Sequence, residues 1–200
     1  CKMASHEEQP RWVRKEYHNI AFGSLNQPIY VIGGFYGGLP DRGTYTIINF
    51  ILTSLETQTH SPLTRWLRRD LGWSYYIRPT LSARHKGIIW TLEIPLLDEK
   101  QIIVVRSEIE HRLRATLNDN DWLKKEVSRR TAQAPFTLET NRQIVEAATT
   151  DLILWGSILS ENGWETMLHA CENSALVSNV LDDYLFSNIG EVAFLPRKRH

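Results

Sequence analysis

Residues 63–77 read LTRWLRRDLGWSYYI, and the pattern of secondary structure changes inside this segment. Ser61 and Pro62, just before it, are typical of a helix start, with serine as the N-cap and proline in the first turn. Gly72 is typical of a helix end, because glycine adopts left-handed backbone angles without strain. The aromatic and β-branched residues of 73–82 then favour a strand. The segment therefore predicts a short helix, a break at Gly72 and a strand.

Two strands and a longer helix are expected before this segment. The strands are predicted at 17–23 and 28–38, where β-branched and aromatic residues lie between Gly, Pro and Asn. The helix is predicted after Pro40-Asp41, because apolar residues recur there at helical spacing. These residues are Tyr45, Ile48, Ile51, Leu52 and Leu55.

After the segment, a second strand is predicted at 87–96 beyond a polar turn at 83–86. Asp98 and Gln101 have the spacing of a capping box and begin a helix. Its apolar face is formed by Ile102, Val105, Ile109 and Leu113. Further helices are predicted near 120–132, 139–159, 162–171 and 174–186, with a final strand at 191–196. This order of elements predicts an α+β layer fold with a mostly antiparallel sheet.

The composition describes one ordinary globular domain, with 200 residues of which 42% are apolar and 23% charged. Lys+Arg and Asp+Glu both number 23, so the formal net charge is zero. This balance gives no electrostatic basis for binding nucleic acid or an anionic membrane, and it argues against a DNA-recognition helix in the arginine-bearing segment 63–77. No apolar run predicts a membrane span. We expect a cytoplasmic protein, and a first residue of Cys1 leaves a periplasmic lipoprotein or an organellar protein open.

The common hydrolytic and phosphate-binding motifs are missing. None of the seven histidines forms HExxH or HxxEH, and Glu108 with His111 is more typical of a solvated helix face than of a metal site. We therefore expect this chain alone to bind no metal and to carry no cofactor. There is no GxSxG elbow, and Cys171 lies among apolar helical neighbours, as a buried structural cysteine does. The glycines of 33–38, GGFYGG, have no following Lys-Ser/Thr and do not form a phosphate loop.

One constellation in 63–77 remains. Leu67-Arg68, Gly72 four residues after the arginine and Tyr75 seven residues after it resemble the second-half domains of the pitrilysin family of inverted-motif zinc peptidases, which includes the mitochondrial processing peptidases. The order of elements from about Tyr17 to Pro196 is similar to that of these domains. The resemblance implies a sheet of about five to six strands with helices packed on one face.

By this resemblance the chain is the half that does not bind zinc. Catalytic members hold HxxEH in their first long helix, whereas the corresponding stretch 44–52, TYTIINFIL, contains neither His nor Glu. The resemblance implies a single peptidase-like inactive half-domain over 13–196, after a loose N-terminal arm at 1–12 and before a basic tail at 197–200. It also implies a partner domain or subunit that carries HxxEH and zinc, and a peptide substrate bound as an extended strand. The chain would then be part of a zinc metalloendopeptidase and inactive alone.

The family assigns roles to the arginine and the tyrosine. Carried over, Arg68 and Tyr75 are catalytic residues that stabilise the negative charge on the substrate carbonyl oxygen while the partner's zinc activates the attacking water. Arg69 and Tyr76 are the alternatives one position along, with substrate-binding roles. A strand at 73–82 would turn Tyr76 to the opposite face from Tyr75.

Other interpretations stay open. The chain can be a non-catalytic scaffold or peptide-binding subunit that keeps the fold, or an interaction domain without a peptide site. Taken alone, Arg68 is also typical of a surface arginine at a helix C-terminus, and Tyr75 of a half-buried sheet residue. Trp66, Trp73 and Trp90 are expected in the core rather than along a peptide groove.

Overall fold

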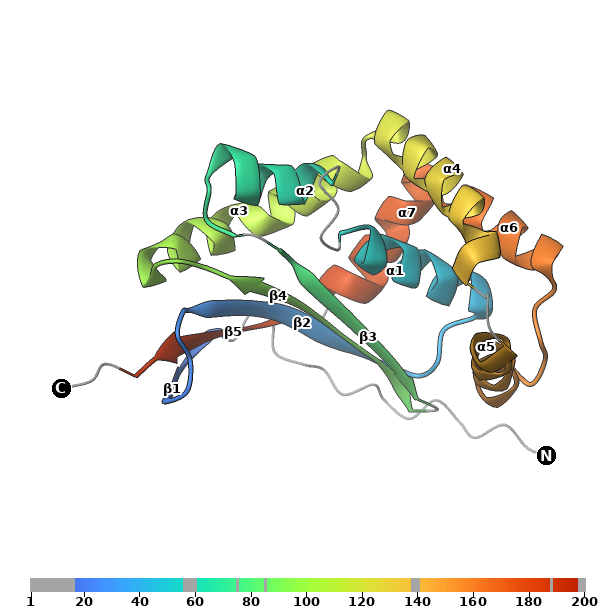
Figure 1. Ribbon diagram of the computed structural model, residues 1–200, viewed down its shortest axis with the longest axis horizontal. Helices are drawn as coiled ribbons and strands as arrows, with labels where there is room; N and C mark the ends of the chain where they lie inside the picture. The colour runs from blue at the N-terminus through green and yellow to red at the C-terminus, as the bar shows by residue number, and fades with distance from the viewer. Residues whose placement is uncertain are drawn as a thin grey trace.

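The computed structural model describes residues 17–55, 61–74, 76–84, 86–137, 141–187 and 189–197. Within them, a five-stranded sheet in the order β1-β5-β2-β4-β3 carries helices on one face (Figure 1). The strands are β1 (Tyr17–Phe22), β2 (Ile29–Gly37), β3 (Arg78–Arg84), β4 (Gly87–Pro95) and β5 (Ile189–Pro196). β1 runs parallel to β5, and the other neighbouring strands are antiparallel. The predicted α+β fold with a mostly antiparallel sheet is confirmed.

Strand periodicity explains why only one face of the sheet is covered. Successive side chains of a strand point to opposite faces. In β4, Ile88 and Trp90 are buried beneath the helices, whereas Ile89 between them is 52% exposed. The strand register places Ile20 and Phe22 of β1 on the same uncovered face as Ile89. The core therefore lies between the sheet and the helices.

The first helix, α1 (Arg42–Ser54), is capped by Asp41, whose side chain accepts a hydrogen bond from the Thr44 backbone N at 3.0 Å. Its buried residues include Ile48 and Ile51, which belong to the core. Helix α3 (Glu99–Leu117) begins with the predicted capping box of Asp98 and Gln101. All four residues predicted for its apolar face are buried, namely Ile102, Val105, Ile109 and Leu113.

The helix predicted after Ser61 has two parts. It starts as α2 (Pro62–Arg65) and continues as the π-helical turn η1 (Trp66–Asp70). Gly72 follows with a φ of +66°, as predicted for a helix end. The prediction that the next strand starts at residue 73 is wrong, since β3 begins at Arg78. The backbone N–H groups of Trp73 and Ser74 donate to the Leu67 carbonyl at 2.9 and 3.4 Å, so this backbone is bonded to the helix end and not to a strand.

The second half of the chain forms helices close to the predicted ranges. They are α4 (Asn120–Thr137), α5 (Asn141–Trp155), α6 (Glu161–Ala170), α7 (Ser174–Val180) and a second π-helical segment, η2 (Leu181–Phe186). The predicted helix 139–159 stops earlier than expected, because Gly156 takes a φ of +70° directly after α5. No helix in the described ranges has the length and apolar composition needed to cross a bilayer. The predicted arm 1–12 lies outside the described residues.

Candidate functional site

Arg68 and Arg69 lie in η1, at the end of the helix that precedes Gly72. Trp66 and Leu67 of the same turn are buried and fix it to the core. Both arginines are exposed, and within the described residues no hydrogen bond or ion pair holds either guanidinium. The helix end thus presents two guanidinium groups to solvent without a partner among the described residues, and their donors can bind a carbonyl or carboxylate oxygen.

The two candidate tyrosines differ in what the structure describes. Tyr75 lies outside the described residues. Tyr76 is half-buried, and the Arg78 guanidinium lies 5.5 Å from its ring centroid. Since β3 begins only at Arg78, the strand alternation expected to separate Tyr75 from Tyr76 does not apply. The meeting of Arg68 with Tyr75 therefore stays a prediction.

Helix α1 occupies the place where the resemblance puts a zinc-binding helix in catalytic members. Its sequence, RGTYTIINFILTS, contains no His, Cys, Asp or Glu. Its inward positions are filled by aliphatic side chains, of which Ile48 and Ile51 are 0% exposed. Burial raises the pKa of Tyr45, the one titratable side chain of α1 besides Arg42. A zinc ion does not fit this donor set, so α1 is a packing helix.

Grouped metal ligands are also absent from the rest of the described residues. In the described ranges, no three His, Cys, Asp or Glu side chains gather in a way that could hold a metal ion. Glu108 forms an ion pair with Arg112 at 3.7 Å, as a solvated helix face does. That the chain carries no cofactor stays a prediction.

Cys171 is buried, as expected of a structural cysteine. Burial raises the pKa of its thiol to about 12. At neutral pH the thiol is therefore protonated, and it does not supply the thiolate that a nucleophile needs.

The tryptophans behave as core residues. Trp66 and Trp90 are 6% and 2% exposed, and Trp73 packs against the same cluster from a half-buried position. The expectation of a core position is confirmed for Trp66 and Trp90, whereas Trp73 is only partly buried.

A polar cluster around the buried Glu191 was missed by the sequence analysis. The Tyr30 hydroxyl donates to Glu191 Oε1 at 2.9 Å, and Arg106 Nε donates to Oε2 at 2.7 Å. The Arg106 guanidinium also lies 4.3 Å from the Tyr17 ring centroid. Burial raises the pKa of Tyr30, and the adjacent Glu191 charge raises it further. The signal in the sequence was a single glutamate at an inward position of an otherwise apolar strand.

This cluster lies at one wall of a cavity of about 410 Å³ between α3 and strands β1 and β5. Both carboxylate oxygens of Glu191 are already bonded to Tyr30 and Arg106. The arrangement fits a structural role, because a buried charge that is paired and hydrogen-bonded ties α3 to the sheet.

Solved structures with this architecture include peptidases. A protease from Helicobacter pylori has a TM-score of 0.74 at 12% identity, over 94% of this chain and 46% of that chain. A peptidase M16 inactive domain from Pseudomonas fluorescens has a TM-score of 0.65 at 14% identity, over 98% of this chain and 47% of that one. The fold is that of an M16 peptidase half-domain.

The half-domain also matches a chain of complex III2 from Candida albicans, with a TM-score of 0.60 at 10% identity, over 90% of this chain and 45% of that chain. This chain spans less than half the length of all three matched chains. No family model and no curated protein sequence matches it.

Proposed function

We propose that this chain is the half of an M16-type zinc peptidase that does not bind zinc, and that Arg68 and Tyr75 act on the substrate at a partner's HxxEH site. The observation that carries the proposal is the position of Arg68. It stands exposed and without an acidic partner among the described residues, at a helix end fixed to the core by Leu67. This helix end is part of a fold that resembles M16 half-domains.

Peptide hydrolysis needs hydrogen-bond donors directed at the carbonyl oxygen of the substrate. Attack of water on a peptide carbonyl builds negative charge on the carbonyl oxygen, and zinc supplies the Lewis acid that activates the water. On this chain, the Arg68 guanidinium and the Tyr75 phenol donate hydrogen bonds to that oxygen as the charge develops. Preorganised donors act more strongly in a site from which water is excluded.

A partner is needed because α1 offers no zinc ligand. The matched chains are more than twice as long as the region that this chain covers, which leaves room in each for a second unit of similar size. The HxxEH unit is proposed to be such a second unit, either a separate subunit or another part of the same polypeptide.

The test is peptide cleavage by the assembled peptidase. Arg68→Ala or Tyr75→Phe should lower kcat by about 100- to 1,000-fold, because each removes one donor to the developing charge. Arg65→Ala is the matched control, since Arg65 is an exposed arginine of the same helix outside the motif. The assembly should keep its stoichiometry in every variant, as measured by sedimentation.

Full-rate cleavage by both Arg68→Ala and Tyr75→Phe would contradict the assigned roles. A loss in Arg69→Ala and Tyr76→Phe instead would move the site one position along the chain.

The second candidate function is a non-catalytic scaffold. The likeness to a chain of complex III2 favours it, since that chain is described as part of a complex. A scaffold predicts assembly with a partner and no effect of Arg68→Ala on any cleavage rate.

A further inference from the structure

Ser74 directly precedes Tyr75 in the chain and is a buried serine that the proposed function does not use. It is 4% exposed, and its hydroxyl donates to the Tyr76 carbonyl at 2.8 Å. Its backbone N–H donates to the Leu67 carbonyl at 3.4 Å. One residue is thus bonded both to the helix end just before Arg68 and to the chain beyond Tyr75.

The Ser74 hydroxyl is bonded as a structural group and not as a nucleophile. A serine nucleophile is activated by an adjacent base that accepts its proton. Here the hydroxyl donates to a backbone carbonyl, and no His, Asp or Glu side chain among the described residues is hydrogen-bonded to it. Ser74 can therefore act on the proposed reaction only by holding other residues in place.

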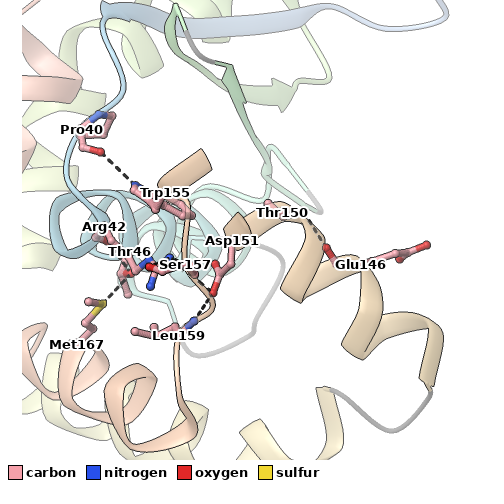
Figure 2. Close-up of polar contacts among 10 residues, drawn as sticks. All are labelled: Pro40, Arg42, Thr46, Glu146, Thr150, Asp151, Trp155, Ser157, Leu159 and Met167. Atoms are coloured by element: carbon pink, nitrogen blue, oxygen red, sulfur yellow. Dashed lines mark hydrogen bonds and ion pairs between the residues drawn. The ribbon is translucent and has the colours of Figure 1, made fainter. Parts of the chain in front are cut away.

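The direction of this hydrogen bond differs from that of hydroxyl groups inside the helices. Thr150 donates to the Glu146 carbonyl, four residues before it and within α5 (Figure 2). Such a bond adds to backbone that the helix already fixes. The Ser74 hydroxyl instead donates forward to Tyr76, and both residues lie outside helices and strands. It therefore restricts backbone that no helix or sheet hydrogen bonds hold.

The end of α5 provides a comparison, because it also closes at a left-handed glycine, Gly156. The chain after it is held by side chains from two helices. Nη2 of Arg42 in α1 donates to the Ser157 carbonyl, and Oδ2 of Asp151 in α5 accepts from the Leu159 backbone N at 2.9 Å (Figure 2). Long-range contacts thus fix the chain where it leaves α5.

The segment after Gly72 has fewer contacts of this kind. No side chain of another element hydrogen-bonds the described residues of 72–76. The Arg78 guanidinium lies 5.5 Å from the Tyr76 ring centroid, but the Arg78 side chain is 62% exposed, and such a contact is a weak constraint. The placement of this segment therefore depends mainly on the hydroxyl of Ser74.

We propose that Ser74 is a positioning residue of the proposed site, which holds Tyr75 at a fixed place relative to Arg68. The inference rests on the proposed function, which assigns these two residues to the substrate carbonyl oxygen. Arg68 is anchored independently, because Trp66 and Leu67 of the same turn are buried in the core. Alignment of the second donor then decides the rate, since a misplacement of about 1 Å can cost about 100-fold.

The test compares two buried serines in the assembled peptidase. Ser74→Ala removes the hydroxyl that donates to the Tyr76 carbonyl. Ser61→Ala is the matched control, because Ser61 is 2% exposed and its hydroxyl has no hydrogen-bond partner among the described residues. Ser74→Ala should lower kcat about 10- to 100-fold and keep KM within about twofold of the wild-type value. Ser61→Ala should leave both constants unchanged.

A second measurement separates positioning from a general structural role. In a chain that already carries Tyr75→Phe, the hydroxyl that Ser74 positions is absent, so adding Ser74→Ala should lower kcat by less than about twofold. An equal fold-loss with and without Tyr75→Phe would overturn the proposal. If Ser74→Ala does not fold, as judged by circular dichroism, Ser74→Cys replaces it in both measurements, because a thiol is a weaker donor than a hydroxyl.

The failures can be told apart. If Arg68→Ala and Tyr75→Phe lower kcat but Ser74→Ala cleaves at the full rate, the positioning role is wrong and the proposed function stands. If Arg68→Ala and Tyr75→Phe both cleave at the full rate, the proposed function fails and the inference fails with it. A loss in Ser61→Ala as large as that in Ser74→Ala would also overturn the assignment, because it would reflect the loss of any buried hydroxyl.

Discussion

Helices α1 and α5 are both rich in aliphatic residues and of similar length, yet only α1 is buried. Ile48 and Ile51 of α1 are 0% exposed, whereas Ile153 of α5 is 75% exposed. α1 faces the sheet, and α5 stands beside α1, attached by Arg42. Apolar composition therefore does not decide burial. The position of a helix relative to the sheet does.

The difference bears on function in two ways. An inward face packed with aliphatic side chains leaves α1 no position for a histidine or a glutamate without the cost of burying charge. An outward apolar face on α5 gains free energy only when something else covers it. The first helix stabilises the core, and the second leaves several apolar side chains exposed among the described residues.

The largest expected effect is on core packing. Ile51→Ala in α1 should lower the free energy of unfolding by about 2–5 kcal/mol, because it leaves a cavity under the sheet. Ile153→Ala in α5 should change it by less than about 0.5 kcal/mol in the isolated chain, since that side chain faces solvent. Urea denaturation of the two variants measures both values. Equal losses would mean that α5 is packed as α1 is.

A smaller effect is expected at the attachment of α5. Arg42→Gln should reduce the free energy that protects the amides of α5 from hydrogen exchange by about 1–3 kcal/mol, because hydrogen bonds to a mostly buried charge are lost. Arg142→Gln is the control, since the Arg142 side chain is 85% exposed. Unchanged protection of α5 in Arg42→Gln would show that another contact holds it.

The smallest effect concerns the cap of α1. Asp41→Ala should cost about 1 kcal/mol at neutral pH, because the Thr44 backbone N loses its acceptor. The hydrogen bond from the Thr44 hydroxyl holds the pKa of Asp41 below its usual range. Its stabilisation is therefore present above the usual pKa of about 4 and is lost as the pH falls through the lower folded value.

Asp41→Asn is the control for this titration, because asparagine caps a helix without a charge to lose. The stability difference between the wild type and Asp41→Asn should shrink as the pH falls through the lowered pKa of Asp41. A difference that is constant with pH, measured by thermal unfolding, would contradict the assigned cap.

Sequence periodicity predicted most of the fold, because burial on one face is written in the spacing of apolar residues. The face of α3 from Ile102 to Leu113 is an example. The left-handed Gly72 was predicted separately, from the backbone freedom of glycine. The start of β3 was misplaced because the aromatic residues of 73–77 are typical of a strand, whereas the backbone N–H groups of Trp73 and Ser74 donate to the Leu67 carbonyl at the helix end. The π-helical turn η1 leaves no separate trace in the periodicity of such a short helix.

The candidate site was less accessible to the same reasoning. The spacing of Arg68 and Tyr75 in the sequence identifies two candidate residues but does not give the distance between their side chains. Of the two, only Arg68 lies among the described residues. The hydrogen-bond partners of Glu191 are Tyr30 and Arg106, which lie far from it in the sequence, so no local pattern could pair them.

The placement of β5 has a consequence for how the chain is made. β5 sits between β1 and β2, so Tyr17 pairs with Glu191 and β1 has no neighbouring strand until β5 is present. During synthesis the place between β1 and β2 stays empty until β5 has been translated, after the other four strands. Contacts this distant in sequence slow folding, so the nascent chain is expected to expose the edge of β2 to chaperones until β5 has been translated.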